Sequence, residues 1–237
     1  MTPPDPSPSL PGARAFRSVR ADRAFAWYSE ALRLFKKQPV GFAALAVATA
    51  IVEIVLMLLP LVGPPAANIV VPIVASSLLF AALATDRGDK PRAAHLLAPF
   101  AAPARAIGTV VAATLVVSGV EWLAGWHLAG VNLLSIDAIA EVAATDLLVV
   151  YVLGVAASLP LTLVPLFAFL EGATLRESFA WSLAAFLRNV PAFLLYGGLG
   201  IALLGVVFVT QGLATIIVLP LWAASSYAAW KDLLNAA

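Results

Sequence analysis

One ionisable side chain, Glu53, falls well inside a long apolar stretch, about thirteen positions beyond the start of that stretch at Val40. A carboxyl group at this depth in a bilayer is energetically expensive and by default suggests a functional site. It could relay protons, bind a cation or meet a cationic substrate. The alternative is structural, because burial without a partner favours the neutral, hydrogen-bonding acid. The candidate partners of a neutral Glu53 are Ser76, Ser77, Thr162 and any backbone carbonyl released by a proline.

Prolines interrupt the later apolar stretches, where they free backbone carbonyls and can kink a helix. These helix-kink candidates are Pro72, Pro160, Pro165 and Pro220. In transporters, interrupted helices at related positions of structural repeats often mark a binding site. Many membrane helices also tolerate proline without binding a ligand, so both interpretations stay open.

The sequence carries no signature of catalysis. It contains no cysteine, no Gly-x-Ser-x-Gly motif and no glycine-rich phosphate loop followed by lysine. Its two histidines, His95 and His127, are predicted on opposite sides of the membrane and so cannot share a metal ion. A second acid, Glu121, is expected near the outer membrane interface, in contact with water. We therefore expect no enzymatic activity, no metal site and no cofactor.

The composition decides which solvent the helices must face. Of the 237 residues, 62% are hydrophobic and 11% are charged, whereas soluble domains average about 45–50% apolar and about 25% charged residues. A soluble fold could not hide this much apolar surface, so the solvent must be lipid. A formal net charge of +1 also argues against a nucleic-acid partner.

Six apolar stretches are long enough to cross a bilayer as helices, which need about 17–25 residues. They are Val40–Leu61, Ala66–Thr85, Ala106–Leu123, Leu147–Leu170, Ala192–Thr210 and Gly212–Trp230. Their apolar residues follow one another without the alternation that transmembrane strands require. We therefore predict an all-α, polytopic membrane protein. Residues 1–18 are expected to be a disordered, proline-rich tail and residues 19–237 one six-helix domain.

Basic residues predict the orientation, because cytoplasmic loops collect Lys and Arg. All 14 Lys and Arg residues lie in the N-terminal segment, in the second and fourth connections or at the C-terminus. The first, third and fifth connections contain none. Both termini are therefore predicted to be cytoplasmic.

The second, fourth and sixth stretches share a core pattern, which indicates an internal repeat. The three cores are Val71-Pro72-Ile73-Val74-Ala75, Val164-Pro165-Leu166-Phe167-Ala168 and Leu219-Pro220-Leu221-Trp222-Ala223. By depth, Pro160 is a better middle equivalent than Pro165. The prediction is three pseudo-repeated hairpins, each with an interfacial helix, a span going out and a proline-containing span coming back.

Amphipathic segments precede the outgoing spans. From Arg23 to Lys37, one helical face collects apolar residues and the other faces are largely charged. The apolar residues are Phe25, Tyr28, Leu32 and Phe35. Thr174 to Glu177 has the form of a capping box that should start a second such helix. The residues expected to meet anionic lipid headgroups are Arg23, Arg33, Lys36, Lys37, Arg176 and Arg188. The alternative is that these helices are simple connectors.

Two segments resemble a known family. The order Arg23-Ala24-Phe25-Ala26-Trp27, then Leu34-Phe35-Lys36 and Pro39, resembles the opening of a family of uncharacterised six-helix proteobacterial inner-membrane proteins. Glu171-Gly172-Ala173-Thr174 through Ser182, Arg188-Asn189 and Pro191 resembles its second signature. That family is similar to the membrane domain associated with glycerophosphodiester phosphodiesterases. The resemblance implies a bacterial inner-membrane location and brings no catalytic residues.

Two functional hypotheses follow. The first is a non-catalytic integral inner-membrane protein that serves as a scaffold, an assembly factor or a lipid-interacting component of a larger envelope system. The second is a small secondary transporter or channel that uses Glu53 and the proline-interrupted helices. The expected partners are the lipid bilayer and either other membrane proteins or a second copy of the chain.

Reporter fusions after Gly63, Asp137 and Ala237 test the predicted topology. A reporter that is active only outside the cytoplasm should be active at the first two positions, because the basic residues all lie on the other side. A reporter that is active only in the cytoplasm should be active at the third. A cytoplasmic signal at Asp137 would contradict the six-span arrangement.

Overall fold

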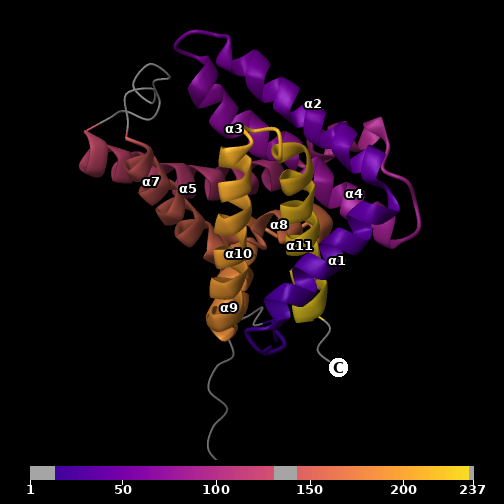
Figure 1. Cartoon of the computed structure of the whole chain (residues 1–237). Helices are drawn as coiled ribbons and strands as arrows, with labels where there is room; N and C mark the ends of the chain where they lie inside the picture. Colours follow the sequence, from indigo (N-terminus) through magenta and orange to yellow (C-terminus); the bar gives the residue numbers. More distant parts are fainter. Residues whose placement is uncertain (1–13, 131–142, 235–237) are drawn as a thin grey trace, which may run out of the picture.

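The computed structural model describes residues 14–130 and 143–234, and all regular secondary structure in these ranges is helical (Figure 1). The all-α prediction is confirmed. In chain order the helices are α1 (Arg23–Lys37), α2 (Pro39–Met57), α3 (Gly63–Ala75), α4 (Ser77–Asp86), the 3-10 helix η1 (Ala93–Ala101), α5 (Ala104–Ala129), α7 (Ala144–Ser158), the 3-10 helix η2 (Leu159–Leu161), α8 (Val164–Leu170), α9 (Leu175–Arg188), α10 (Val190–Val209) and α11 (Thr215–Leu234).

Proline and capping residues set several helix boundaries. Pro39 and Pro191 occupy the first turns of α2 and α10, where a missing N–H leaves no helical hydrogen bond unmade. At the start of α9, the Thr174 hydroxyl accepts from the backbone N–H of Glu177 at 3.4 Å, and the Glu177 carboxylate accepts from the backbone N–H of Thr174 at 2.9 Å. The predicted capping box is confirmed.

Four helical stretches among the described residues are long and apolar enough to cross a membrane. They are Pro39–Met57, Gly63–Asp86, Ala104–Leu128 and Val190–Val209. The pair Leu148–Leu161 and Val164–Leu170, bent by 44°, makes a fifth if it counts as one span. By length and composition these helices suit a membrane protein, while the six-span arrangement stays a prediction.

The sixth predicted span, Gly212–Trp230, corresponds to α11, which is not among these candidates. The second half of α11 is too polar, since it carries Ser225, Ser226 and Asp232, all of them buried. They are buried because α11 contacts α1, α2, α4 and α10. The polar half of α11 therefore faces protein rather than lipid.

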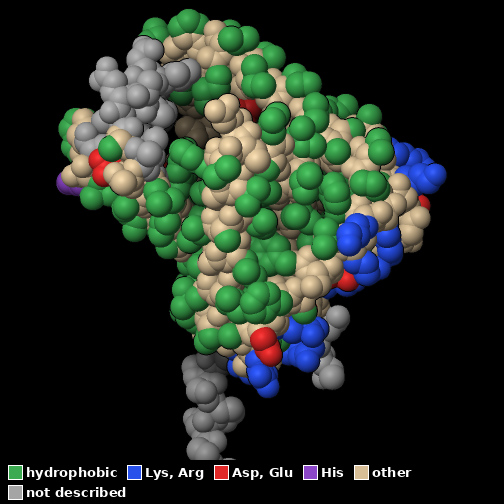
Figure 2. All heavy atoms as spheres, viewed as in Figure 1, with side chains coloured by type: hydrophobic (Ala, Val, Ile, Leu, Met, Phe, Trp, Pro, Cys, Tyr) green, Lys and Arg blue, Asp and Glu red, His purple; other side chains and the backbone are tan. Residues whose placement is uncertain are grey.

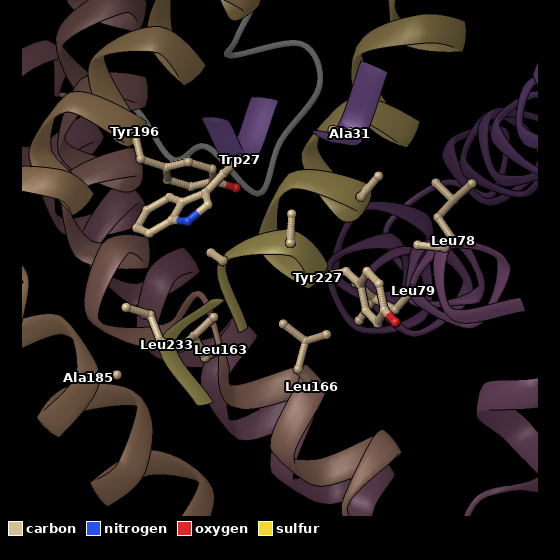
Figure 3. Close-up of a cluster of buried hydrophobic side chains, with 14 of the residues drawn as sticks. Trp27, Ala31, Leu78, Leu79, Leu163, Leu166, Ala185, Tyr196, Tyr227 and Leu233 are labelled. Carbon is tan, nitrogen blue, oxygen red and sulfur yellow. The ribbon is translucent and has the colours of Figure 1, made fainter. Parts of the chain in front are cut away.

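Helix α1 crosses the lower part of α11 in Figure 1, and the face that it buries agrees only in part with the predicted one, because only Tyr28 and Phe35 of the predicted face pack against the core. Its buried residues are Ala24, Trp27, Ala31 and Leu34. Phe25 and Leu32, from the predicted apolar face, are exposed. The small alanines permit close approach, and the Trp27 ring lies 6.0 Å from that of Tyr196 on α10 (Figure 3). Close packing against protein, rather than apolar content, decides which face is buried.

The buried core fills only the half of the bundle nearest the chain ends. It draws on the first half of α2, on α4 and α8, on the start of α10 and on the second half of α11. In the other half, large apolar side chains such as Ile54, Trp126 and Leu148 are exposed. Figure 2 shows apolar side chains covering much of the surface there. Such a surface suits a lipid environment.

Three carboxylates lie where helices return toward the chain ends, and we call them the acidic rim: Asp86 at the end of α4, Glu171 just after α8 and Asp232 in the last turn of α11. Each accepts a hydrogen bond at 2.9 Å from an aromatic side chain, which is Tyr227, Trp230 and Trp27, respectively. Each is also paired with a basic side chain, which is Lys231, Arg14 and Arg23, respectively. The rim thereby links α4 and α1 to α11. It also links the end of α8 both to α11 and to the segment that precedes α1.

The segment before α1 is bound to the bundle, although residues 1–18 were predicted to be disordered. The Arg17 backbone N–H donates to the Leu233 carbonyl at 2.9 Å. Asn189, at the junction of α9 and α10, accepts from the Val19 N–H at 2.8 Å and donates to the Arg17 carbonyl at 3.0 Å. Phe16 is buried against Phe167. The prediction is therefore wrong for residues 14–18, because buried hydrogen-bond partners hold them, and residues 1–13 lie outside the described part.

The proline-containing helices differ in local structure. The break between α3 and α4 follows Pro72 at Ser76, whereas α11 continues through Pro220. Between η2 and α8 the break is bridged by Ser182 of α9, whose hydroxyl donates to the Pro160 carbonyl at 2.7 Å and accepts from the Leu163 N–H at 3.2 Å. The predicted repeat therefore stays a prediction from the sequence, because the local structure differs from one proline to the next.

Replacing Asp232 should destabilise the protein at neutral pH. Burial alone would raise the pKa of Asp232, but hydrogen bonds from Arg23 and Trp27, with the charges of Arg23 and Arg17, hold the pKa below its usual range. A lowered folded-state pKa contributes stability above the unfolded-state pKa of about 3.9, and this is lost as the pH falls through the folded-state value. Asp232→Asn should therefore lower the free energy of unfolding at pH 7 by about 1.5–3 kcal/mol.

Thermal unfolding in detergent, followed from pH 7 to pH 3, measures this effect. The parent and Asp232→Asn should converge at the acid end. The matched control is Asp22→Asn, since Asp22 is exposed and pairs only loosely with Arg20, 3.4 Å away; it should change little. Equal stability of Asp232→Asn and the parent at pH 7 would refute a stabilising role of the pair.

Candidate functional site

A cavity of about 580 Å³ lies between the helices. Its wall is built from α1, α2, α3, α4, α5, α7, η2, α8, α10 and α11, so it draws on almost every element of the bundle. In Figure 2 the surface is hollowed near the upper ends of α3 and α10. A volume in the range of about 300–1,000 Å³ is typical of ligand-binding pockets.

Five of the eight intramembrane residues singled out from the sequence line this cavity. They are Glu53, Pro72, Ser76, Thr162 and Pro165. Ser77 is fully buried away from it, Pro160 lies at the break bridged by Ser182, and Pro220 is buried within α11. The structure thus brings the acid and two of the helix breaks into one wall.

The hydroxyl groups expected to bond Glu53 bond their own helices instead. Ser76 donates to the Pro72 carbonyl at 2.8 Å, and Thr162 donates to the Ser158 carbonyl at 3.2 Å. Within the described ranges, Glu53 takes part in no hydrogen bond or ion pair of the protein. It lies one turn before the end of α2, with its side chain exposed and in the cavity wall. The hydrogen-bond partners that a structural role of Glu53 requires are therefore not found among the expected residues.

A second carboxylate, Glu121, lines the same cavity, although the sequence suggested a site in water near the outer interface. Helix α5 continues to Ala129, so Glu121 lies about two turns inside the helix. Its carboxylate rests against Gly154 of α7, where a methyl group would lie 2.1 Å from Glu121 Oε1. Tyr151 is close enough to Glu121 and Glu53 to interact electrostatically with both.

The charged side chains that line the cavity are all acidic. Glu53 and Glu121 are its ionisable acids, and no Lys, Arg or His occurs among the lining residues. The basic residues that pair with acids do so at the acidic rim and along α1. A positive charge for the cavity must therefore come from outside the described part of the chain.

Aromatic side chains close the cavity toward the packed half of the bundle. Tyr28 reaches in from α1, stacks on Tyr196 with centroids 5.1 Å apart and donates its hydroxyl hydrogen to the Tyr196 carbonyl at 3.2 Å. Burial raises the pKa of Tyr28, so it stays a neutral donor. Trp222 of α11 completes this floor, and Gly200 of α10 lies beside both Tyr28 and Trp222.

The six residues expected to meet lipid headgroups divide into two groups. Arg23 pairs with Asp232, and the Arg33 Nε donates to Glu30 at 2.7 Å, so both serve the fold. The other four are exposed and make no ion pair with any described residue: Lys36, Lys37, Arg176 and Arg188. Among residues 14–130 and 143–234, no three His, Asp or Glu side chains gather as metal ligands could.

Comparisons with protein-family models, with curated proteins and with solved structures find no match for this chain. Functional inference therefore depends on the cavity itself.

Because Glu53 has no hydrogen-bond or ion-pair partner among the described residues, its replacement should leave stability unchanged. Glu53→Gln and Glu53→Leu should each alter the free energy of unfolding in detergent by less than about 0.5 kcal/mol. Ser182→Ala is the positive control: it leaves the Pro160 carbonyl and the Leu163 N–H unpaired and should cost about 1–3 kcal/mol. A selective loss of 1–2 kcal/mol in Glu53→Leu, on the scale of about one membrane hydrogen bond, would restore the structural role of Glu53.

Proposed function

We propose that this protein is a non-catalytic, lipid-interacting component of a larger envelope system, and that it binds an apolar or amphiphilic molecule in the cavity between its helices. The cavity is the observation that carries the proposal. It combines a largely apolar wall with a few polar groups, which is the usual character of a small-molecule site.

The distribution of packing supports this function. The half of the bundle near the chain ends is filled by the buried core, whereas the other half leaves its helices splayed around the cavity with exposed apolar side chains. A scaffold without a ligand gains nothing from unfilled space, because lost packing contacts destabilise a fold. Binding a lipid-like molecule would restore those contacts.

The proposed location is the bacterial inner membrane with both termini cytoplasmic. One observation supports it: the basic residues cluster in alternate connections, as they do in cytoplasmic loops. In Figure 2 the Lys and Arg side chains on the visible face gather along its right-hand and lower edge, on the side of α1 and the acidic rim.

Transport is the second candidate function, and one observation favours it. Pro72 and Pro165 lie in the cavity wall together with Glu53. Broken helices beside a binding site are a frequent feature of secondary transporters. Uptake of a bound ligand into sealed proteoliposomes, absent in Glu53→Gln, would favour transport over simple binding.

Filling the cavity should abolish ligand binding. Val117 lines the cavity, whereas its neighbour Val116 on α5 points away and is 48% exposed. The two substitutions Val117→Trp and Val116→Trp add the same volume at adjacent positions. Saturable binding of tritiated dodecanol to the protein in phosphatidylcholine nanodiscs should fall at least tenfold in Val117→Trp and stay at the parent level in Val116→Trp.

Equal binding by both variants and the parent would place the ligand elsewhere and contradict the cavity function. Empty nanodiscs measure the non-saturable partition of dodecanol into lipid. Thermal unfolding of each variant in detergent shows whether the added indole disturbs the fold.

A further inference from the structure

Among the described residues that line the cavity, two are acidic and none is basic. Glu53 reaches it from α2 and Glu121 from α5, and Tyr151 of α7 interacts electrostatically with both. Neither carboxylate is paired with a Lys, Arg or His of the described chain. The three carboxylates of the acidic rim contrast with these two, because each rim carboxylate has both an aromatic donor and a basic partner.

An unpaired carboxylate in a lipid-facing cavity favours a ligand of opposite charge. The attraction between two charges grows as the local dielectric constant falls, and acids within membrane segments usually face a partner or a substrate pathway. Residues in the described ranges supply partners for the rim acids and none for these two, so we expect a complementary charge to come from a ligand.

The charged lining residues lie at one end of the cavity. Glu53, Asn68 and Glu121 lie toward those ends of α2, α3 and α5 that point away from the chain termini. Toward the packed half, the wall carries no charged side chain and includes the buried apolar residues Leu79, Val110 and Leu159. The hydroxyl groups of Tyr28, Ser76 and Thr162 in this wall donate to carbonyl groups of the protein. This order suits a molecule with a polar head at the outer end and an alkyl chain pointing inward.

We propose that the ligand of this cavity is a cationic amphiphile, a long-chain ammonium compound whose head lies between Glu53 and Glu121 and whose chain lies along the apolar inner wall. This proposal rests on the proposed binding function and specifies its ligand class. Gly154 is a positioning residue in this arrangement, because its missing side chain leaves the space in which the Glu121 carboxylate lies.

The test compares two probes of equal chain length, dodecylamine and dodecanol. Both are tritiated, and saturable binding is measured at pH 7 in phosphatidylcholine nanodiscs, where a primary amine with a pKa of about 10.4, like that of lysine, is charged. The parent should bind dodecylamine at least tenfold more tightly than dodecanol. The double variant Glu53→Gln with Glu121→Gln should bring this preference below about twofold.

Two controls keep the outcomes distinct. Glu30→Gln changes an acid on α1 that does not line the cavity, so it should keep the tenfold preference. Thermal unfolding of the double variant in detergent checks that it folds. Equal binding of both probes by the parent, or a preference that survives the double variant, would overturn the cationic ligand while leaving the cavity function intact. Failure of the parent to bind either probe would overturn the cavity function itself.

Discussion

The fold depends on the hydrogen bonds and ion pairs made by the carboxylates of the acidic rim. Asp232 is buried, yet it is paired with Arg23 and accepts the Trp27 indole hydrogen at 2.9 Å. A buried charge of this kind is tolerated only when it is paired and hydrogen-bonded. Because α1 supplies both donors, the same interaction that satisfies Asp232 fixes α1 across α11.

Fixing α1 has a consequence at the cavity. Tyr28 lies on the same helix as Trp27, and its ring stacks on Tyr196 to form the cavity floor. The ion pair at the end of α11 and the floor of the cavity are therefore two contacts of one helix. A helix expected to lie on the membrane surface thus closes a space within the bundle.

The bundle has two halves with different packing. Near the chain ends, aromatic and small residues fill the interior and the acidic rim ties the helices together. Away from the chain ends, the helices expose apolar side chains outward and enclose the cavity inward. The packed half near the chain ends fixes the helices relative to one another. Their other ends can therefore surround the cavity while the bundle stays intact.

The sequence by itself determined the all-helical class, the start of α9 and the approximate positions of most of the helices that are long and apolar enough to cross a membrane. It also singled out Glu53. These features depend on local composition and capping, which act within a few turns of a helix. Only the tertiary structure decided that α1 buries Trp27 rather than Phe25, that residues 14–18 bind the bundle and that Glu121 shares a cavity with Glu53. Each of these three features depends on contacts between residues far apart in the chain. In a sequence as apolar as this one, the hydrophobic pattern alone cannot distinguish a helix face that packs on protein from one that faces lipid.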